Sequence, residues 1–284
     1  MGSATGTAKA LRAKANAMPT DALPRIGLGT YSDDDREQWR TNVETALDVG
    51  YRHVDTAQDY GNERYVGAGL ADAGLDRDDV FLATKLAPGN LGYEDVLATT
   101  EASLDRLGVD ALDLLYVHWP VDAYDPDETL RALDELHDEG AIRHVGLSNF
   151  SPALLEEARD ILDAPVTAHQ VECHPYLQQD ELRAYAREHD HWLVAYSPLA
   201  QGAVLDDPVL TDIADKYDAT PAQVSLAWLL SKDSVAVIPK ASSWEHMEQN
   251  LTARDLSLED EDLERIDGIE REHRVIDPDF GPWN

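Results

Sequence analysis

The chain has little cysteine and little positive charge: Cys173 is its only cysteine, and 23 lysine and arginine residues face 56 aspartate and glutamate residues. A single cysteine excludes an intrachain disulfide, so we expect a cytoplasmic protein. The formal net charge of −33 repels nucleic acid and anionic membranes and argues against both as partners. The sequence shows no secretory leader and no run of about 20 apolar residues, so we expect no membrane span.

The acidic residues are spread along the whole chain, in runs such as Asp33–Asp35 and Glu259–Asp262. Self-repulsion of this size destabilises a compact fold unless salt screens it, and the Debye length falls to about 3 Å at 1 M salt. We therefore predict a protein adapted to high ionic strength. An acidic protein of ordinary cytoplasm is the alternative.

The length of 284 residues and the hydrophobic content of 43% suit one large domain. We expect residues 1–17 to form a mobile extension, because they carry no apolar stripe that continues into the fold. Residues 18–284 then form the domain, whose C-terminal tail would lie over one barrel mouth. No contact surface can be recognised, and we expect a monomer.

Short apolar segments alternate with amphipathic stretches from residue 25 onward. The predicted strands are 26–30, 52–55, 80–85, 112–119, 144–149, 167–172, 192–197 and 234–240. Predicted helices include 39–47, 94–107, 127–138, 152–162, 179–189 and 221–230, with a further one inside 256–271.

Alternation of this kind predicts an α/β fold with parallel strands and helical crossovers, and eight units close most simply into a (β/α)8 TIM barrel. An open doubly wound sheet is the alternative. Its dinucleotide fingerprint is absent, because the Gly27–Gly29 segment lacks a third glycine and the Gly67–Gly69 segment lies in a helical pattern.

Polar residues gather where the predicted strands end, which in barrel enzymes is the catalytic rim. Four of them form a complete acid–base set: Asp55, Tyr60, Lys85 and His118. We expect the lysine ammonium to lower the pKa of the tyrosine, the aspartate to keep the buried lysine charged, and the histidine to orient a substrate oxygen. The neighbouring Thr56, Gln58 and Glu63 are expected to be solvated or to cap the helix that starts near Asn62.

Several segments resemble, in order and spacing, the motifs of the aldo-keto reductase superfamily: "GYRHVDTAQDYGNE", "FLATKL", "DLLYVHWP", "VGLSNF", "HQVECHPYLQ", "LVAYSPLAQG" and "VIPKASSWEHMEQN". The likeness runs from about residue 23 to residue 271, and "PLAQGAVLDDPVL" with the short tail is similar to the prokaryotic branch of 2,5-diketo-gluconate reductases. The resemblance implies a barrel that binds NADP(H) and reduces aldehydes or ketones. It assigns the same four residues as catalytic, with Tyr60 as general acid in reduction.

The resemblance also implies the cofactor contacts. The nicotinamide would be held by Ser148, Asn149, Gln170 and Tyr196, the pyrophosphate by segment 197–202 with Ser197, Leu199 and Gln201, the 2′-phosphate by Lys240, Ser242 and Ser243, and the adenine by Asn250. His246 stands where the family commonly has an arginine that binds the 2′-phosphate. Because a histidine offers neither the fork nor the permanent charge, we expect NADP(H) to be discriminated from NAD(H) less strongly than in the family.

The same likeness places Tyr31 and Trp119 in the pocket for a small carbonyl or alcohol substrate, with segment 120–124, Phe280 and Trp283 at its rim. The sequence does not single out one carbonyl compound, and we assign no metal ligands. Two alternatives remain at this point. One is a Schiff-base aldolase that uses Lys85, and the other is a non-catalytic nicotinamide-binding sensor.

Overall fold

The computed structural model describes residues 23–31 and 35–284. The predicted extension over residues 1–17 lies outside these residues. Eight parallel strands form one sheet in chain order. The strands are β1 (Leu28–Gly29), β2 (His53–Asp55), β3 (Phe81–Leu86), β4 (Leu112–Val117), β5 (Ile142–Ser148), β6 (Val166–Glu172), β7 (Trp192–Tyr196) and β8 (Val235–Val237). The predicted (β/α)8 fold is confirmed, and the open doubly wound sheet is excluded.

The first and last strands are shorter than predicted, yet they meet and close the barrel. Ile26 pairs with Val237, and Gly29 pairs with Lys240, both in parallel orientation. A Cβ atom on Gly29 would lie 2.5 Å from the carbonyl oxygen of Ile238. The missing side chain therefore lets the backbones approach at the closing seam.

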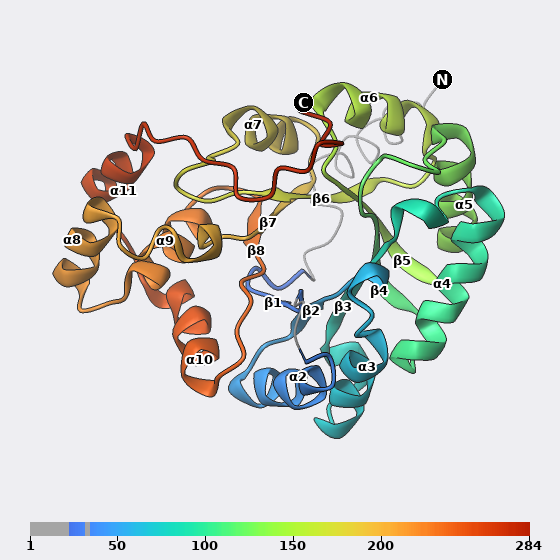
Figure 1. The fold of residues 1–284 in the computed structure, drawn as a ribbon, viewed down its shortest axis with the longest axis horizontal. Helices are drawn as coiled ribbons and strands as arrows, with labels where there is room; N and C mark the ends of the chain where they lie inside the picture. The colour runs from blue at the N-terminus through green and yellow to red at the C-terminus, as the bar shows by residue number, and fades with distance from the viewer. Residues whose placement is uncertain (1–22, 32–34) are drawn as a thin grey trace, which may run out of the picture.

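Helices surround the strands as an outer ring (Figure 1). They are α2 (Gln38–Val49), α3 (Glu63–Asp72), α4 (Tyr93–Leu107), α5 (Pro126–Asp138), α6 (Pro152–Ile161), α7 (Asp180–Glu188), α8 (Pro208–Tyr217), α9 (Pro221–Leu230), α10 (Trp244–Thr252) and α11 (Asp260–Asp267). Four of them, α5, α6, α8 and α9, begin with the same local device, a side-chain cap followed by proline: Asp125, Ser151, Asp207 and Thr220. The cap accepts a free backbone N–H, and proline has none to leave unpaired.

The alternation of side chains along each strand separates an inner from an outer core. On β3, Phe81 and Ala83 belong to the inner cluster, whereas Leu82 and Leu86 pack against the helices. Lys85 therefore shares the inner face with Phe81 and Ala83, because residues two apart point to the same side. Apolar packing below thus positions a charged group at the top of the barrel.

The same period of two directs other polar groups inward at the carboxyl ends of the strands. Gln170 follows Ala168 on β6, and Tyr196 follows Val194 on β7, where both preceding residues belong to the inner cluster. Gly146 on β5 makes room for the ring of Tyr116, because a Cβ atom at residue 146 would lie 2.4 Å from that ring. The end of the barrel is thus packed from below and polar above.

Candidate active site

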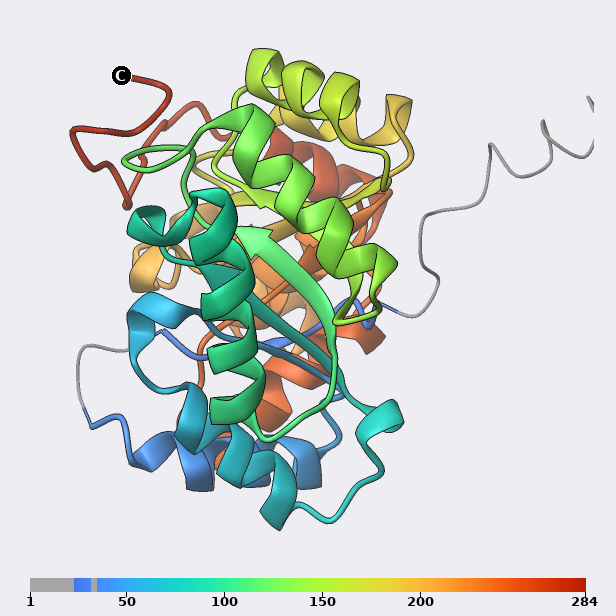
Figure 2. The ribbon, with the colours of Figure 1, turned by 90° about the vertical axis from the view of Figure 1, so that its right-hand side faces the viewer.

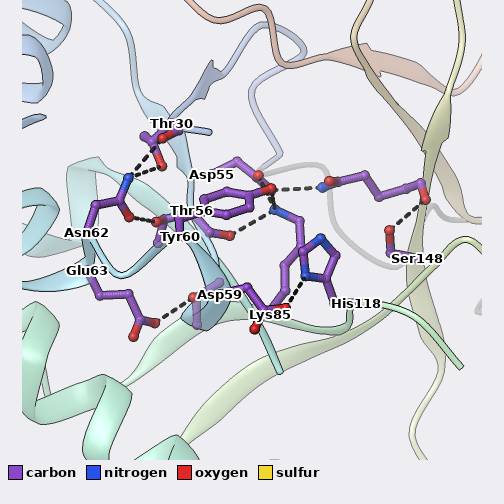
Figure 3. Close-up of polar contacts among 12 residues, drawn as sticks. Thr30, Asp55, Thr56, Asp59, Tyr60, Asn62, Glu63, Lys85, His118 and Ser148 are labelled. Carbon is purple, nitrogen blue, oxygen red and sulfur yellow. Dashed lines mark hydrogen bonds and ion pairs between the residues drawn. The ribbon is translucent and has the colours of Figure 1, made fainter. Parts of the chain in front are cut away.

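Lys85 and Asp55 form a buried ion pair at the centre of this polar layer (Figure 3). Each residue is 1% exposed. The lysine ammonium donates to the Asp55 carboxylate and, at 2.8 Å, to the carbonyl oxygen of Thr56. Gln170 donates to the second Asp55 oxygen at 2.8 Å, so both carboxylate oxygens are bonded.

Burial lowers the pKa of Lys85, and the Asp55 carboxylate opposes that shift. The direction agrees with the expectation that a lysine at the top of the barrel needs a paired carboxylate. Removal of either partner would leave a buried charge uncompensated, which is far more costly than the loss of an exposed ion pair.

Tyr60 is brought over this pair by a tight turn. The turn η1 (Gln58–Tyr60) follows β2 and ends at Gly61, whose φ of +62° lies in the left-handed region that favours glycine. The phenol oxygen lies 3.5 Å from Lys85 Nζ. The Tyr60 ring packs edge-on against the rings of Tyr31 and His118, with centroid distances of 5.2 and 5.8 Å.

The expectation that Lys85 lowers the pKa of Tyr60 is wrong. Burial raises the pKa of Tyr60 well above 10, and the charge of Asp55 raises it further. The physical reason is that the lysine charge is largely compensated by Asp55, whereas the phenolate would be desolvated in full. The phenol is therefore protonated throughout the neutral range.

His118 follows β4, and its side chain is 14% exposed. Its Nδ1 atom lies 3.5 Å from an Asp59 carboxylate oxygen. Burial lowers the pKa of His118, while the Asp59 carboxylate opposes the shift. The ring is thus neutral at pH 7.

Sequence reasoning did not single out Asp59. Its side chain is 46% exposed, and it stands beside Tyr60 in the same turn as well as near His118. Its negative charge contributes to the raised pKa of Tyr60. The available clue was its position between two candidate residues in a turn that brings both to the barrel.

Thr56 and Glu63 are buried, contrary to the expectation that they are solvated or cap the helix. Glu63 is 2% exposed, and its carboxylate accepts from Thr84 at 2.7 Å and from Arg106 at 2.8 Å. Asn62 does not cap α3 but donates to the carbonyl oxygen of Thr30 and accepts from Thr56, both at 2.8 Å (Figure 3). These buried bonds brace the loop that carries Tyr60.

Gln58 also has a bracing role. Its side-chain oxygen accepts from the backbone of Ala87 at 3.0 Å and from the amide of Asn90 at 2.9 Å. Its side-chain nitrogen donates to Thr99 and Ser103. The turn after β2 is therefore tied to the loop after β3, which fixes Tyr60 relative to Lys85.

A second polar group continues from His118 around the rim. Asn149 donates to the carbonyl oxygen of His118 at 3.0 Å and accepts from the Tyr196 hydroxyl at 2.9 Å. Ser148 donates to the backbone carbonyl of Gln170 at 2.9 Å. The four residues predicted to hold the nicotinamide thus lie together at the ends of β5, β6 and β7, and all except Tyr196 are buried.

The segment after β7 has an unusual backbone. Ser197, Ala200 and Gln201 have φ values of +46°, +46° and +52°, in the left-handed region that non-glycine residues seldom adopt. Such strained segments cluster at ligand-binding sites. Ser197, Leu199 and Gln201, predicted to follow the pyrophosphate, all belong to this segment.

The residues predicted for the 2′-phosphate lie after β8 and are exposed: Lys240, Ser242, Ser243 and His246. The Ser243 side chain caps α10 by accepting from the backbone N–H of His246 at 3.3 Å. Lys216 and Lys232 are paired with acids, whereas Lys240 has no ion pair with any residue of the described chain. Asn250 is 4% exposed, so it lies beneath this surface.

Aromatic rings line the space beside Tyr60 and His118. Trp119 is 9% exposed and Tyr31 51% exposed. Phe280 and Trp283 of the C-terminal segment contact Trp119, with centroid distances of 5.4 and 5.6 Å. Figure 2 shows this segment on the same side of the molecule as the turn that follows β2.

The profile of the Aldo/keto reductase family matches residues 25–271, which is most of the chain. The chain belongs to the aldo/keto reductase family. The match includes the barrel and all four candidate acid–base residues.

Individual members of the family agree with this assignment. The chain is 40% identical over 254 residues to a glyoxal reductase of Bacillus subtilis, covering 89% of this chain and 91% of the relative. It is 38% identical over 261 residues to the methylglyoxal reductase DkgB of Escherichia coli O157:H7, covering 91% and 97%. The crystal structure of a putative 2,5-diketo-D-gluconic acid reductase B superposes with a TM-score of 0.87 at 36% identity, covering 90% of this chain and 92% of that one.

A cavity of about 550 Å³ lies beside the acid–base set of this aldo/keto reductase, not over it. Its walls come from three segments, 149–152, 175–182 and 267–274, together with Val171, Pro282 and Trp283. It reaches the predicted nicotinamide site only through Asn149. The cavity therefore lies along the C-terminal segment, and it is distinct from the space that the aromatic rings line.

Within residues 23–31 and 35–284 of this aldo/keto reductase, no three histidine, cysteine or acidic side chains are grouped so that they could hold a metal ion. None of the helices in this part of the chain has the length and apolar character that a membrane span requires.

Proposed function

We propose that the protein reduces aldehydes or ketones to alcohols with NAD(P)H, and that Tyr60 is the general acid. Family membership supports carbonyl reduction. The observation that carries the residue assignment is the contact of Lys85 with both Asp55 and Tyr60, beside the ring of His118. A phenol next to an ammonium and a neutral imidazole can donate a proton to a carbonyl oxygen and leave a stabilised phenolate.

The raised pKa of Tyr60 keeps the phenol protonated at neutral pH, which is the form that reduction requires. A protonated phenol is the form that gives a proton to the nascent alkoxide, which is a far stronger base. Oxidation would start from the phenolate, which burial disfavours. His118, neutral because burial lowers its pKa, can orient the substrate oxygen by a hydrogen bond without competing as an acid.

The residues at the ends of β5 to β8 fit a dinucleotide with a phosphate group. Bound there, NADP(H) would supply the hydride. Buried amides at Asn149 and Gln170 match a carboxamide, and the Tyr196 hydroxyl is already held by Asn149, which orients the ring at the rim. Lys240 is an unpaired cation within the described chain, and it lies near the N-terminus of α10, where backbone N–H groups favour anions.

Selectivity between the two nicotinamides would be weaker than in relatives with an arginine at the position of His246. A lysine attracts a 2′-phosphate as a point charge, but it lacks the bidentate geometry of a guanidinium. We therefore propose that NADP(H) is preferred and that NAD(H) is also used.

Small dicarbonyls such as glyoxal and methylglyoxal are the first substrates to test, because two relatives carry those names. The aromatic walls from Tyr31 and Trp119 suit small or flat carbonyl compounds. The similarity to the structure of a putative diketo-gluconic acid reductase also supports the proposed prokaryotic branch.

A Schiff-base aldolase is disfavoured by the contacts of Lys85. Its ammonium protons are directed at Asp55, Thr56 and Tyr60, so no free amine is offered to a carbonyl carbon. Borohydride treatment with a ketone substrate should leave the mass of the protein unchanged. An adduct at Lys85 would support the aldolase.

The test is a kcat/KM screen of glyoxal, methylglyoxal and aromatic aldehydes with NADPH and NADH in molar KCl. We expect turnover by wild type, and a fall in kcat of about 100- to 10,000-fold in Tyr60→Phe because the general acid is removed. NADPH binding, followed by fluorescence, should persist. Tyr65→Phe is the control, because that hydroxyl contacts Glu37 on the surface. Cofactor binding without turnover by wild type would favour the sensor instead.

A further inference from the structure

Glu172 ends β6 and is completely buried, with 0% exposure. It lies two residues beyond Gln170, on the same face of the strand, and therefore above the layer that bonds Asp55. No lysine or arginine of the described chain forms an ion pair with it. A buried carboxylate of this kind requires hydrogen-bond donors.

The donors come mainly from the C-terminal segment. The backbone N–H groups of Val275 and Ile276 donate to the two carboxylate oxygens of Glu172, at 2.6 and 2.8 Å. His174 Nε2 lies 2.9 Å from the first of these oxygens. Because His174 Nδ1 accepts from the backbone of Tyr176, the ring proton is assigned to Nε2 and is donated to Glu172.

Few other polar contacts hold this segment. Between residues 272–284 and the rest of the described chain, the only further hydrogen bond joins the backbone of His273 to Tyr176, at 2.9 Å. The cavity of about 550 Å³ lies along the same segment and removes packing there. Detachment of the tail would strip a buried charge of two donors, so the Glu172 contact resists it more than two neutral hydrogen bonds would.

Beyond Ile276 the tail folds on itself. The Trp283 indole donates to Asp277 at 2.8 Å, and Gly281 donates to the backbone of Pro278 at 2.8 Å. This compact turn carries Phe280 and Trp283 onto Trp119. The position of both rings therefore follows from the position of residues 275 and 276.

We propose that Glu172 is a positioning residue for substrate specificity, which anchors the tail so that Phe280 and Trp283 form the outer wall of the carbonyl pocket. This inference rests on the proposed function for its kinetic consequence, but the anchoring can be tested without turnover. Glu172 does not touch the reacting atoms. It selects among carbonyl compounds by holding the wall against which their distal groups pack.

The main variant is Glu172→Gln, which keeps the shape of the side chain. Its amide group would face an N–H donor of the tail, so at least one of the two bonds is lost. Glu270→Gln is the matched control, because Glu270 is exposed in the same C-terminal region and has no ion pair within the described chain.

The first measurement is limited trypsinolysis after Arg274, followed by mass spectrometry. In the folded protein Arg274 stacks on Trp283, 3.9 Å from the ring centroid. We expect cleavage in Glu172→Gln to be about tenfold faster than in wild type, because local opening governs proteolysis. The control should match wild type. Equal rates in all three proteins would overturn the proposal.

The second measurement compares a bulky aromatic aldehyde with glyoxal. Glu172→Gln should raise KM for the aromatic aldehyde about tenfold and for glyoxal less than about threefold, because glyoxal does not reach the tail. Trp283→Ala should give the same pattern, and the double variant should be no worse than either single one. A uniform loss of kcat for both substrates would show a merely structural role and overturn the proposal.

Hydrogen exchange of the wild type keeps the inference testable if Glu172→Gln does not fold. The amides of Val275 and Ile276 should exchange at least about tenfold more slowly than that of Phe280. Exchange at equal rates would contradict the anchor. If wild type shows no reductase activity, the proposed function fails, while trypsinolysis and exchange still decide whether Glu172 holds the tail.

Discussion

The charged side chains on the two sides of the barrel rim differ in burial and in pairing. At the ends of β2 and β3, Asp55 and Lys85 are buried and satisfy each other, with further bonds from Gln170 and to Thr56. After β8, Lys240 and His246 are exposed, and Lys240 has no acidic partner in the described chain despite a net charge of −33. The first side is complete without a ligand, whereas the second leaves a cation free for one.

This difference indicates which interactions depend on ionic strength. A buried pair in a water-poor site is screened little by salt, and its energy depends on both partners being present. An exposed lysine interacts through water, so its effect is smaller and varies with ionic strength. We therefore expect salt to have little effect on the geometry of the Asp55–Lys85 pair and a larger effect on cofactor binding at Lys240.

Among the changes that test this comparison, Asp55→Asn should have the largest effect. The substitution leaves the Lys85 ammonium buried without a counter-charge, so we expect the free energy of unfolding to fall by about 3–5 kcal/mol. We also expect kcat/KM to fall by about 100-fold, because a buried lysine without its counter-charge tends to lose its proton, and Tyr60 then lacks the neighbouring ammonium. Urea unfolding and steady-state kinetics in the same KCl buffer measure both.

Asp72→Asn provides the matched control, since Asp72 pairs with Arg40 at a partly exposed site. Its loss should be below about 1 kcal/mol. Similar losses at Asp55 and Asp72 would remove the proposed contrast between buried and exposed charge.

Lys240→Met should have the next largest effect. We expect KM for NADPH to rise about tenfold and KM for NADH to change little, because only NADPH carries the 2′-phosphate. Lys232→Met is the control, since that lysine is paired with Asp267. Initial rates with both cofactors give these KM values. An equal rise in KM for both would show that Lys240 does not bind the 2′-phosphate.

The complementary change on the same side is His246→Arg. A guanidinium should increase the preference for NADPH over NADH, measured as the ratio of kcat/KM values, by about tenfold. An unchanged ratio would show that residue 246 does not face the phosphate.

Salt should affect the acidic surface and the buried Asp55–Lys85 pair differently. Screening of the acidic surface should raise Tm by at least about 5 °C between dilute buffer and 1 M KCl. The loss of stability caused by Asp55→Asn should stay the same in both buffers, because its partners are buried. Calorimetry of both proteins provides the measurement. A Tm that does not rise would contradict adaptation to high ionic strength.

The smallest effect should be that of pH on kcat. Burial holds the pKa of His118 below 6.5 and raises that of Tyr60 well above 10. The imidazole gains a proton only below its lowered pKa, and the phenol loses one only above its raised pKa. Between about pH 6.5 and 9, kcat for reduction should therefore vary less than about twofold. A descending limb near pH 7.5 would show that the phenol is more acidic than its surroundings imply.

Much of the fold could be predicted because its pattern is local. Alternating strands and helices, capped starts such as Thr220 with Pro221, and the order of polar strand ends are all visible in the chain. The lengths of β1 and β8 were overestimated, since a short strand depends on its neighbours across the closing seam and not on its own composition.

The sequence predicted which residues form the candidate site, but it did not predict their burial or their hydrogen-bond partners. Asp55, Lys85 and His118 could be recognised from their places at strand ends. The burial of Glu63, the approach of Asp59 to His118 and the role of Glu172 could not, because each depends on partners distant in the chain or on a turn whose shape the letters do not record.

The sequence by itself determined the alternation of strands and helices, the family, the acidic surface and the set of residues that we propose for acid–base chemistry. Each of these follows from residue type and spacing alone. Only the tertiary structure decided that Tyr60 is a weaker acid than free tyrosine, that Glu63 braces the loop, and that the tail is held at Glu172. The physical reason is that solvation and hydrogen-bond partners are set by side chains that meet only when the barrel closes.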